Sequence, residues 1–122
     1  MKNFELDEIK ISEIVKTCFK LTKAEYDIFV FFLKNKEEEY FTEEVANFLK
    51  MNLSTIQRAV KKMCEQKLLT KRQSNLKGGG YLFIYKIKSQ SVIKNILEDK
   101  LDFWIAKVQK ELLNNGLKEL LK

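Results

Sequence analysis

Three of the chain's four glycines are consecutive, at positions 78–80, and the 122 residues include no proline. Glycine relieves the steric bar on positive φ, so the backbone can reverse tightly at this point. The segment 68–73 before these glycines starts apolar, and the segment 81–87 after them is rich in aromatic and β-branched side chains. Both patterns are typical of strands. The sequence therefore predicts a β-hairpin with its turn at residues 74–80, in a chain that is otherwise mostly helical.

Two helices are expected first along the chain. Residues 1–20 carry apolar side chains at helical spacing, among them Leu6 and Val15. Thr22 followed three residues later by Glu25 is a capping box, which predicts a second helix that is strongly apolar up to Leu33. The charged residues 34–39 after it are interpreted as a solvated loop. Three of them are consecutive glutamates, but consecutive carboxylates on a turn point in different directions, so we do not expect a metal site there.

Two shorter helices follow and precede the hairpin. Thr42 is a good N-cap for one of them, and Asn52 is a good N-cap for the next. The first is expected to turn four apolar side chains inward, namely Val45, Ala46, Phe48 and Leu49. The second has Ile56, Ala59, Val60 and Met63 on one face and polar or basic residues on the other. Two short helices joined by a turn of three or four residues form a helix-turn-helix unit.

Positive charge is concentrated in one stretch of the chain. Residues 50–77 contain eight lysines and arginines and a single acid, Glu65, so this window has a net charge of +7 against +6 for the whole chain. A localised basic patch is the expected footprint of a polyanion such as nucleic acid. A lysine-rich solvated surface is the alternative that charge alone leaves open.

The end of the chain predicts one long helix, from Ser91 to about Leu121. Its apolar stripe consists of Val92, Ile93, Ile96, Leu97, Leu101, Trp104, Ile105, Val108, Leu112 and Leu113. A helix of roughly 30 residues is about 45 Å long, which is more than so small a domain can cover. We therefore expect part of the stripe to meet a second copy in a coiled-coil-like homodimer. Packing on the first helix of the same chain is the alternative and accounts for some of the stripe.

The segments 41–46 and 52–60 resemble the helix-turn-helix of archaeal and bacterial winged-helix repressors, most closely the TrmB-type and MarR-type families. Leu21-Thr22 with Glu25 resembles the opening of the first helix in TrmB-like regulators. The run Leu68-Leu69-Thr70-Lys71-Arg72 resembles the exit from the recognition helix into the wing, and Gly78-Gly79-Gly80-Tyr81 with Phe83 and Tyr85 resembles the wing of small archaeal members. The resemblance covers about residues 21–88.

The resemblance implies a fold that is mainly α with a small β-wing: a winged helix-turn-helix with a long C-terminal dimerisation helix. The expected segments are an N-terminal helix packing on the dimer region (1–20), the winged helix-turn-helix (21–88) and the dimerisation helix (89–122). TrmB-like proteins add a C-terminal sugar-binding effector domain, whereas this chain has one long helix there, so no sugar ligand is implied. Lys50 and Lys67 stand where glycine is frequent in the family. Lysine adopts positive φ less readily, so we expect these turns to differ locally.

In this architecture the recognition helix enters the major groove of double-stranded DNA, and the wing approaches the backbone or the minor groove. The residues that this places at the DNA are Ser54, Thr55, Gln57, Arg58, Lys61, Lys62, Lys71, Arg72 and Lys77. Gln57 can pair bidentately with adenine and Arg58 with guanine, although both residue types also serve as plain phosphate contacts. Lys61 and Lys62 are expected to neutralise phosphates. The predicted function is a sequence-specific transcriptional regulator that binds DNA as a homodimer.

Catalysis is not expected. The chain has no histidine, so the usual imidazole base and metal ligand are missing, and it has no Walker-type phosphate loop. Cys18 and Cys64 are too few and too isolated for a disulfide framework or a zinc site. The longest apolar run has six residues, whereas a membrane span needs about 20. We therefore expect a cytoplasmic protein without a cofactor, a metal or a membrane partner.

Two other functions stay open at this point. One is non-specific, chromatin-type binding to DNA, which uses the same phosphate contacts. The other is a winged-helix scaffold that binds proteins, although a scaffold does not need the basic surface. The sequence does not assign an operator, a small-molecule effector, thiol redox control, or a choice between activation and repression.

Overall fold

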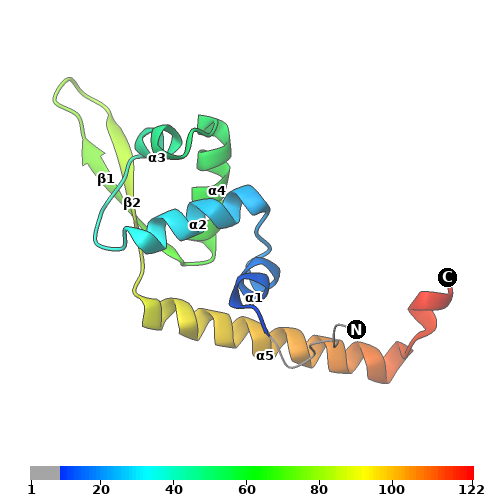
Figure 1. Cartoon of the computed structure of the whole chain (residues 1–122). Coiled ribbons are helices and arrows are strands. Elements are labelled where there is room, and N and C mark those ends of the chain that lie inside the picture. The colour runs from blue at the N-terminus through cyan, green and yellow to red at the C-terminus, as the bar shows by residue number, and fades with distance from the viewer. Residues whose placement is uncertain (1–8) are drawn as a thin grey trace, which may run out of the picture.

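The computed structural model of the chain describes residues 9–122 (Figure 1). The described residues form five α-helices, one two-stranded antiparallel sheet and a short 3-10 helix. In chain order these are α1 (Ile11–Cys18), α2 (Lys23–Lys34), α3 (Thr42–Leu49), α4 (Leu53–Glu65), β1 (Leu69–Asn75), β2 (Tyr81–Ile87), α5 (Gln90–Asn115) and η1 (Lys118–Leu121). This is the predicted winged-helix architecture. The first predicted helix is described only from residue 9 onward, and Leu6 lies outside the described residues.

The helix starts follow the sequence signals in two cases out of three. At α2 the Thr22 hydroxyl accepts a hydrogen bond from the Glu25 N–H at 3.1 Å, and the Glu25 carboxylate accepts one from the Thr22 N–H at 2.8 Å, so the capping box is confirmed. Asn52 is the N-cap of α4, as predicted. Thr42 is not a cap, because it is the first residue of α3 and Phe41 takes the cap position. The Glu44 carboxylate there accepts a hydrogen bond from the Phe41 N–H at 2.8 Å.

Lysines at three turns adopt the left-handed backbone conformation. Lys20, Lys50 and Lys67 have φ values of 55°, 54° and 66°, at the ends of α1, α3 and α4. At Lys50 the next residue, Met51, donates to the Ala46 carbonyl at 3.1 Å and closes the short turn between α3 and α4. The prediction that the turns at Lys50 and Lys67 differ locally is wrong, because both lysines adopt the positive φ that glycine favours, at some cost in steric strain.

The core lies between α2, α3, α4 and the base of the sheet, with contributions from α1 and α5. The side chains with essentially no exposed surface are Phe19, Phe29, Phe32, Ile28, Ile56, Met63, Leu68, Val45 and Val60. The predicted inner face of α4 is confirmed, because Ile56, Ala59, Val60 and Met63 are all buried. The inward placement of Phe48 is wrong. This side chain is 66% exposed and lies at the surface against the rings of Phe31 and Tyr40.

The sheet is the predicted hairpin, and it projects from the helical body in Figure 1. Its register runs from Leu69 opposite Ile87 at the base to Asn75 opposite Tyr81 near the tip. The glycines at 79 and 80 have φ values of 95° and 79°, so the turn uses the conformation that only glycine adopts freely. The first strand continues two residues beyond the predicted end, and the connection is correspondingly shorter. Tyr40 forms an isolated antiparallel β-bridge with β2, because it exchanges two 2.8 Å backbone hydrogen bonds with Tyr85.

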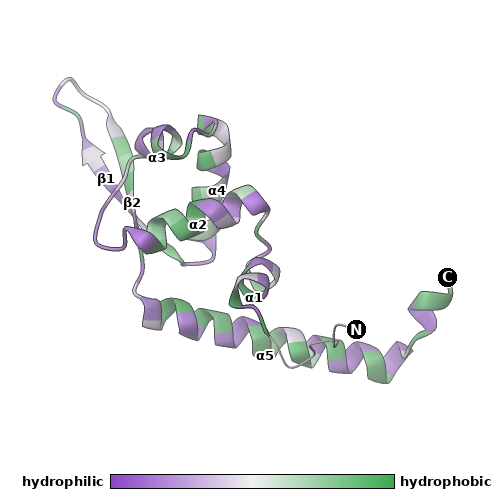
Figure 2. Ribbon diagram, viewed as in Figure 1, coloured by the Kyte–Doolittle hydropathy of each residue, from purple (hydrophilic) through white to green (hydrophobic). Residues whose placement is uncertain are grey.

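Helix α5 runs past the base of the sheet and under α1, then continues beyond both (Figure 1). Its first half contributes Ile93 to the core and packs against α1 through half-buried residues such as Ile96 and Leu97. Its second half, from residue 102 on, mixes apolar and polar residues along the helix (Figure 2). The side chains of residues 102–114 are all exposed in the single chain. The helix ends at Asn115, earlier than predicted, because Gly116 adopts a φ of 57°.

Candidate nucleic-acid interface

Helix α4 presents four of the predicted DNA-contacting side chains on one face. Ser54, Gln57, Arg58 and Lys61 are all exposed, and their spacing of three, one and three residues places them on adjacent turns of the helix. The opposite face is the buried apolar face, so the core contacts of α4 determine which of its side chains are exposed. The exposed side chains offer an amide, a guanidinium and an ammonium group, which are donors suited to base edges and phosphates.

The wing faces α4 with one side of its sheet. Lys71 lies over the Phe83 ring, with its Nζ atom 4.4 Å from the ring centroid, and both line a hollow with Lys61 and Cys64 of α4. The cation is therefore held on an aromatic surface next to the recognition face of α4. Lys77 lies in the exposed hairpin loop. The fold brings Lys71 to the same side as the exposed face of α4.

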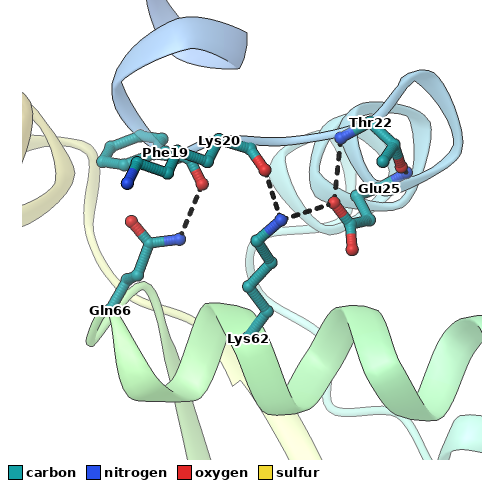
Figure 3. Close-up of polar contacts among 6 residues, drawn as sticks. All are labelled: Phe19, Lys20, Thr22, Glu25, Lys62 and Gln66. Atoms are coloured by element: carbon teal, nitrogen blue, oxygen red, sulfur yellow. Dashed lines mark hydrogen bonds and ion pairs between the residues drawn. The ribbon is translucent and has the colours of Figure 1, made fainter.

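Lys62 is placed differently from its neighbour Lys61. Its ammonium group lies 2.9 Å from the Glu25 Oε1 atom and also donates to the Lys20 carbonyl oxygen, as Figure 3 shows. Thr55 lies on the same flank of α4, seven residues earlier, and both side chains are only half-exposed. The structure thus does not bring Lys62 together with the exposed residues of α4. Its predicted role at a phosphate stays a prediction.

Arg72 also has an intramolecular partner. Its guanidinium donates from Nε and Nη2 to the two carboxylate oxygens of Glu39, at 2.7 and 2.9 Å. The hydrogen bonds from Arg72 hold the pKa of the Glu39 carboxyl below its usual value. Neighbours along a strand point to opposite faces of the sheet, so Arg72 lies on the face away from Lys71 and α4. Arg72 therefore joins the wing to the loop before α3, and its predicted contact with DNA stays a prediction.

Sequence reasoning missed the acidic partners of these two cations and the role of Gln66. The Gln66 side chain donates to the Phe19 carbonyl at 2.9 Å, beside Lys62 (Figure 3). Glu25 is 37 residues from Lys62 in the chain, and Glu39 is 33 residues from Arg72. The only sequence signal at any of these partner residues was the capping box at Glu25. It explained Glu25 as part of the start of α2, without reference to α4.

The remaining reactive groups are consistent with structural roles. Burial raises the pKa of the Cys64 thiol, despite Lys71 and Lys88 nearby, and burial likewise raises the pKa of the Cys18 thiol. Within residues 9–122, no group of three or more His, Cys, Asp or Glu side chains could hold a metal ion. None of the helices in that range is both long enough and apolar enough to cross a membrane.

A solved structure with a closely similar fold is that of a possible transcriptional regulator from Methanosarcina mazei Go1. It has 36% sequence identity to this chain, and the alignment covers 94% of this chain and 96% of that one, with a TM-score of 0.81. The chain belongs to the winged-helix transcriptional regulators. This agrees with the resemblance carried by residues 21–88, and it indicates a DNA-binding regulator.

Three further proteins are similar to this winged-helix regulator. Two uncharacterized proteins of Methanocaldococcus jannaschii are similar in sequence. One is 29% identical over 97 residues, which cover 80% of this chain and 72% of the relative, and the other is 26% identical over 115 residues, which cover 92% and 93%. A crystal structure of a Sulfolobus tokodaii protein, 18% identical, covers 86% of this chain and 99% of that one with a TM-score of 0.66, which shows the fold alone. No family model matches the chain.

Proposed function

We propose that this chain is a sequence-specific regulator that binds double-stranded DNA as a homodimer. The observation that carries the proposal is the shared placement of two basic features. The exposed face of α4 and the inner face of the wing lie side by side, with Arg58 and Lys61 on one and Lys71 on the other. A helix next to a basic hairpin on one side of a domain matches the surface of duplex DNA, whose groove and backbone are both within reach.

In the proposed complex α4 lies in the major groove. Gln57 and Arg58 read base edges, because an amide can pair bidentately with adenine and a guanidinium with guanine. Ser54 contacts the duplex near the start of α4, and Lys61, Lys71 and Lys77 contribute phosphate contacts. Each phosphate contact steepens the salt dependence of binding by about 0.9 in the logarithmic slope. These contacts fix the position of the protein, whereas the base contacts select the sequence.

The distal half of α5 supports a dimer. Leu101, Ile105, Val108 and Leu112 recur at intervals of four, three and four residues, which is the spacing of a coiled-coil seam. From Ile105 on, these side chains are between 39% and 53% exposed in the single chain. Trp104, 52% exposed, lies beside them and lines a cavity of about 810 Å³ between α1 and α5. A second copy of the same helix is the occupant that presents the same seam in return.

A dimer of this kind predicts the form of the DNA site. The two copies of α4 would enter successive major grooves about 34–36 Å apart, which is one turn of the duplex. The binding site would then be pseudo-palindromic, in keeping with the two-fold symmetry of the protein.

Fluorescence anisotropy of the protein with a labelled random duplex, titrated across salt concentrations, tests the proposal. Unlabelled genomic fragments then compete for the protein. Salt-steep binding in which a few fragments compete far better than the rest supports a sequence-specific regulator. Equal competition by all fragments favours the chromatin-type alternative. Absence of binding at low salt contradicts a DNA-binding function and favours a protein scaffold.

A further inference from the structure

Three hydrogen bonds join the flank of α4 to the region where α1 leads into α2: two reach the connecting segment, and one reaches Glu25 in the first turn of α2. Lys62 donates to the Glu25 carboxylate and to the Lys20 carbonyl, and Gln66, one turn later, donates to the Phe19 carbonyl (Figure 3). We call this set of contacts the α4 brace. Lys62 and Gln66 are spaced four residues apart, so they reach the connecting segment from the same side of α4. The backbone of that segment is thus attached to α4 at two successive turns.

Glu25 is the centre of the brace. Its side chain is only 15% exposed, and its Oε1 atom accepts both from the Thr22 N–H and from the Lys62 ammonium group. Burial alone would raise the pKa of Glu25, but the hydrogen bonds from Thr22 and Lys62 hold the pKa below its usual value. A charged hydrogen bond in a partly desolvated place is stronger than an exposed ion pair. Releasing Lys62 to bind a phosphate would leave this carboxylate without its cation.

The braced segment is also the connection to the rest of the molecule. Phe19 is fully buried, and the Lys100 ammonium group of α5 lies 6.0 Å from the centre of its ring. Lys20 has its positive φ in this segment, and α1 before it packs against α5. The brace therefore sets the position of α4 relative to the pair formed by α1 and α5. In a dimer built on α5, the same contacts set how the two recognition helices are presented to DNA.

We propose that Lys62 and Gln66 are positioning residues for DNA recognition, which hold α4 on the segment Phe19–Thr22, and that Lys62 makes no phosphate contact. This inference rests on the proposed DNA-binding function. Lys61 is the matched control, because it is the adjacent residue, has the same charge and is exposed, and has no ion pair within residues 9–122. The two roles have different consequences. A misplaced α4 loses base recognition, whereas a lost phosphate contact weakens binding to all sequences.

The test compares Lys62→Met, Gln66→Met and Lys61→Met by anisotropy on the best competing fragment and on a random duplex. For Lys62→Met and Gln66→Met, we expect the dissociation constant for the best fragment to rise about tenfold, because each change removes a partly buried hydrogen bond that holds α4. The constant for the random duplex and the salt slope stay as in the unaltered protein. For Lys61→Met, both DNAs are bound more weakly and the slope falls by about 0.9. Circular dichroism and the melting temperature show whether each variant is folded.

Glu25→Gln distinguishes the two roles of Lys62, because they predict opposite changes in DNA binding. If Lys62 positions α4, removing its anionic partner lowers the ratio of specific to random affinity, as Lys62→Met does, and combining the two changes adds little further loss. If Lys62 contacts a phosphate, Glu25→Gln frees the cation and both DNAs are bound more tightly. Lys62→Arg keeps the donors and the charge and is expected to restore the ratio.

A lower salt slope for Lys62→Met, or tighter binding by Glu25→Gln with an unchanged ratio, would overturn the positioning role alone. Unaltered protein that fails to bind any duplex at low salt would overturn the proposed function, and the positioning role with it. If Lys62→Met does not fold, Glu25→Gln decides the role of Lys62, and Gln66→Met, which changes no charge, tests the positioning of α4. An unchanged ratio in that variant counts against the proposal.

Discussion

The winged body, from α2 to β2, and the distal part of the chain, residues 102–121, use similar side chains in opposite ways. In the body Phe29 and Phe32 are 2% and 0% exposed, and they pack among other apolar groups. In the distal part Phe103 is 67% exposed and Leu113 is 86% exposed. The body therefore has its own core, whereas the distal helix carries apolar surface that residues 9–122 leave uncovered. One region is stabilised by its own fold, and the other has its apolar side chains available for the dimer contact that we propose.

The polar contacts of the two regions differ in the same way. In the body, ion pairs join residues far apart in sequence, such as Lys62 with Glu25 and Arg72 with Glu39. On the distal part the described contacts are local, for example between Lys122 and Glu119. Long-range pairs fix elements relative to one another, whereas pairs three or four residues apart support only their own helix, by a few tenths of a kcal/mol. The following predictions test this contrast, in order of decreasing effect.

Truncating one phenylalanine in each region should give the largest difference between the regions in the free energy of unfolding. Phe32→Ala leaves a cavity in a packed core and is expected to lower the free energy of unfolding by about 3–5 kcal/mol. Phe103→Ala removes an exposed ring and should lower it by less than about 0.5 kcal/mol in the dissociated chain. Urea denaturation at several protein concentrations separates the two effects, because only a contribution from a dimer contact depends on concentration. Equal losses of unfolding free energy in Phe32→Ala and Phe103→Ala at high dilution would contradict the difference between the two regions.

A charge on the distal seam should separate the copies without unfolding the body. Val108→Glu places a carboxylate where we propose that two helices meet, and we expect the dimer dissociation constant to rise about a hundredfold, or roughly 2.7 kcal/mol. Analytical ultracentrifugation measures the constant. Gln109→Glu, the adjacent exposed residue, has the same new charge and should leave the dimer intact. An unchanged dimer in Val108→Glu would show that the copies meet elsewhere.

A change on the recognition face should have the reverse outcome, with DNA binding lost and the dimer kept. Arg58→Ala is expected to weaken binding to the best site by about 1–3 kcal/mol and to relax the sequence preference at one position. Lys34→Ala, which removes one positive charge at the exposed end of α2, is the control for net charge. Anisotropy gives both affinities. Unchanged affinity of Arg58→Ala for the best site would contradict its assignment to a base.

The elements of the fold could be predicted from the sequence because each has a local signal. Glycines 78–80 mark the hairpin turn, and the capping box at Thr22 marks the start of α2. The apolar period of residues 56–63 gave the buried face of α4, and therefore also its exposed face. The predictions of helix ends failed where a neighbouring residue, rather than the predicted one, determined where the helix starts or stops. Phe41 rather than Thr42 takes the N-cap position of α3, where its N–H donates to the Glu44 carboxylate, and Gly116 ends α5 before the predicted end at about Leu121.

The candidate site could be predicted only in part. Charge and spacing predicted a basic surface, and three of the predicted cations, Arg58, Lys61 and Lys71, lie on one side of the molecule. They could not separate Lys61 from Lys62, because the partner of Lys62 lies 37 residues earlier and reaches it only through the tertiary fold. The same holds for Arg72 and Glu39. Which cation is free depends on packing between helices, and a single sequence carries no local signal for that.

Acid should destabilise the winged body through protonation of Glu25. Protonation of the carboxylates in the ion pairs on α5 should have almost no effect on stability. The pKa of Glu25 is lower in the fold than its unfolded value of about 4.3, so its stabilising contribution is full above that pH and is lost as the pH falls through the folded pKa. We expect unaltered protein to exceed Glu25→Gln in stability by on the order of 1 kcal/mol at pH 7, and by clearly less at pH 3. Urea denaturation at the two pH values measures the difference.

For comparison, Glu98→Gln alters an exposed pair in which Lys94 and Glu98 are 3.8 Å apart, and it should change the stability very little at either pH. A difference for Glu25→Gln that persists unchanged at pH 3 would show that the carboxylate charge is not what stabilises the brace.

The smallest expected effect concerns backbone conformation at the end of one helix in each region. Lys67, after α4, has a φ of 66°, and Gly116, after α5, has a φ of 57°. The left-handed conformation costs a residue with a side chain about 1 kcal/mol, and the greater unfolded-state freedom of glycine offsets part of that. Lys67→Gly should therefore raise the free energy of unfolding by about 0.5 kcal/mol, whereas Lys67→Ala, which keeps a Cβ atom, should not. Gly116 combines its positive φ with a ψ of −133°, a region that only glycine adopts freely, so Gly116→Ala adds backbone strain. The residue lies outside the core, so the change should fray only the end of α5. Urea denaturation measures the first two changes, and amide hydrogen exchange at residues 110–116 measures the third. Global destabilisation by Gly116→Ala would mean that the distal helix and the winged body unfold as one unit.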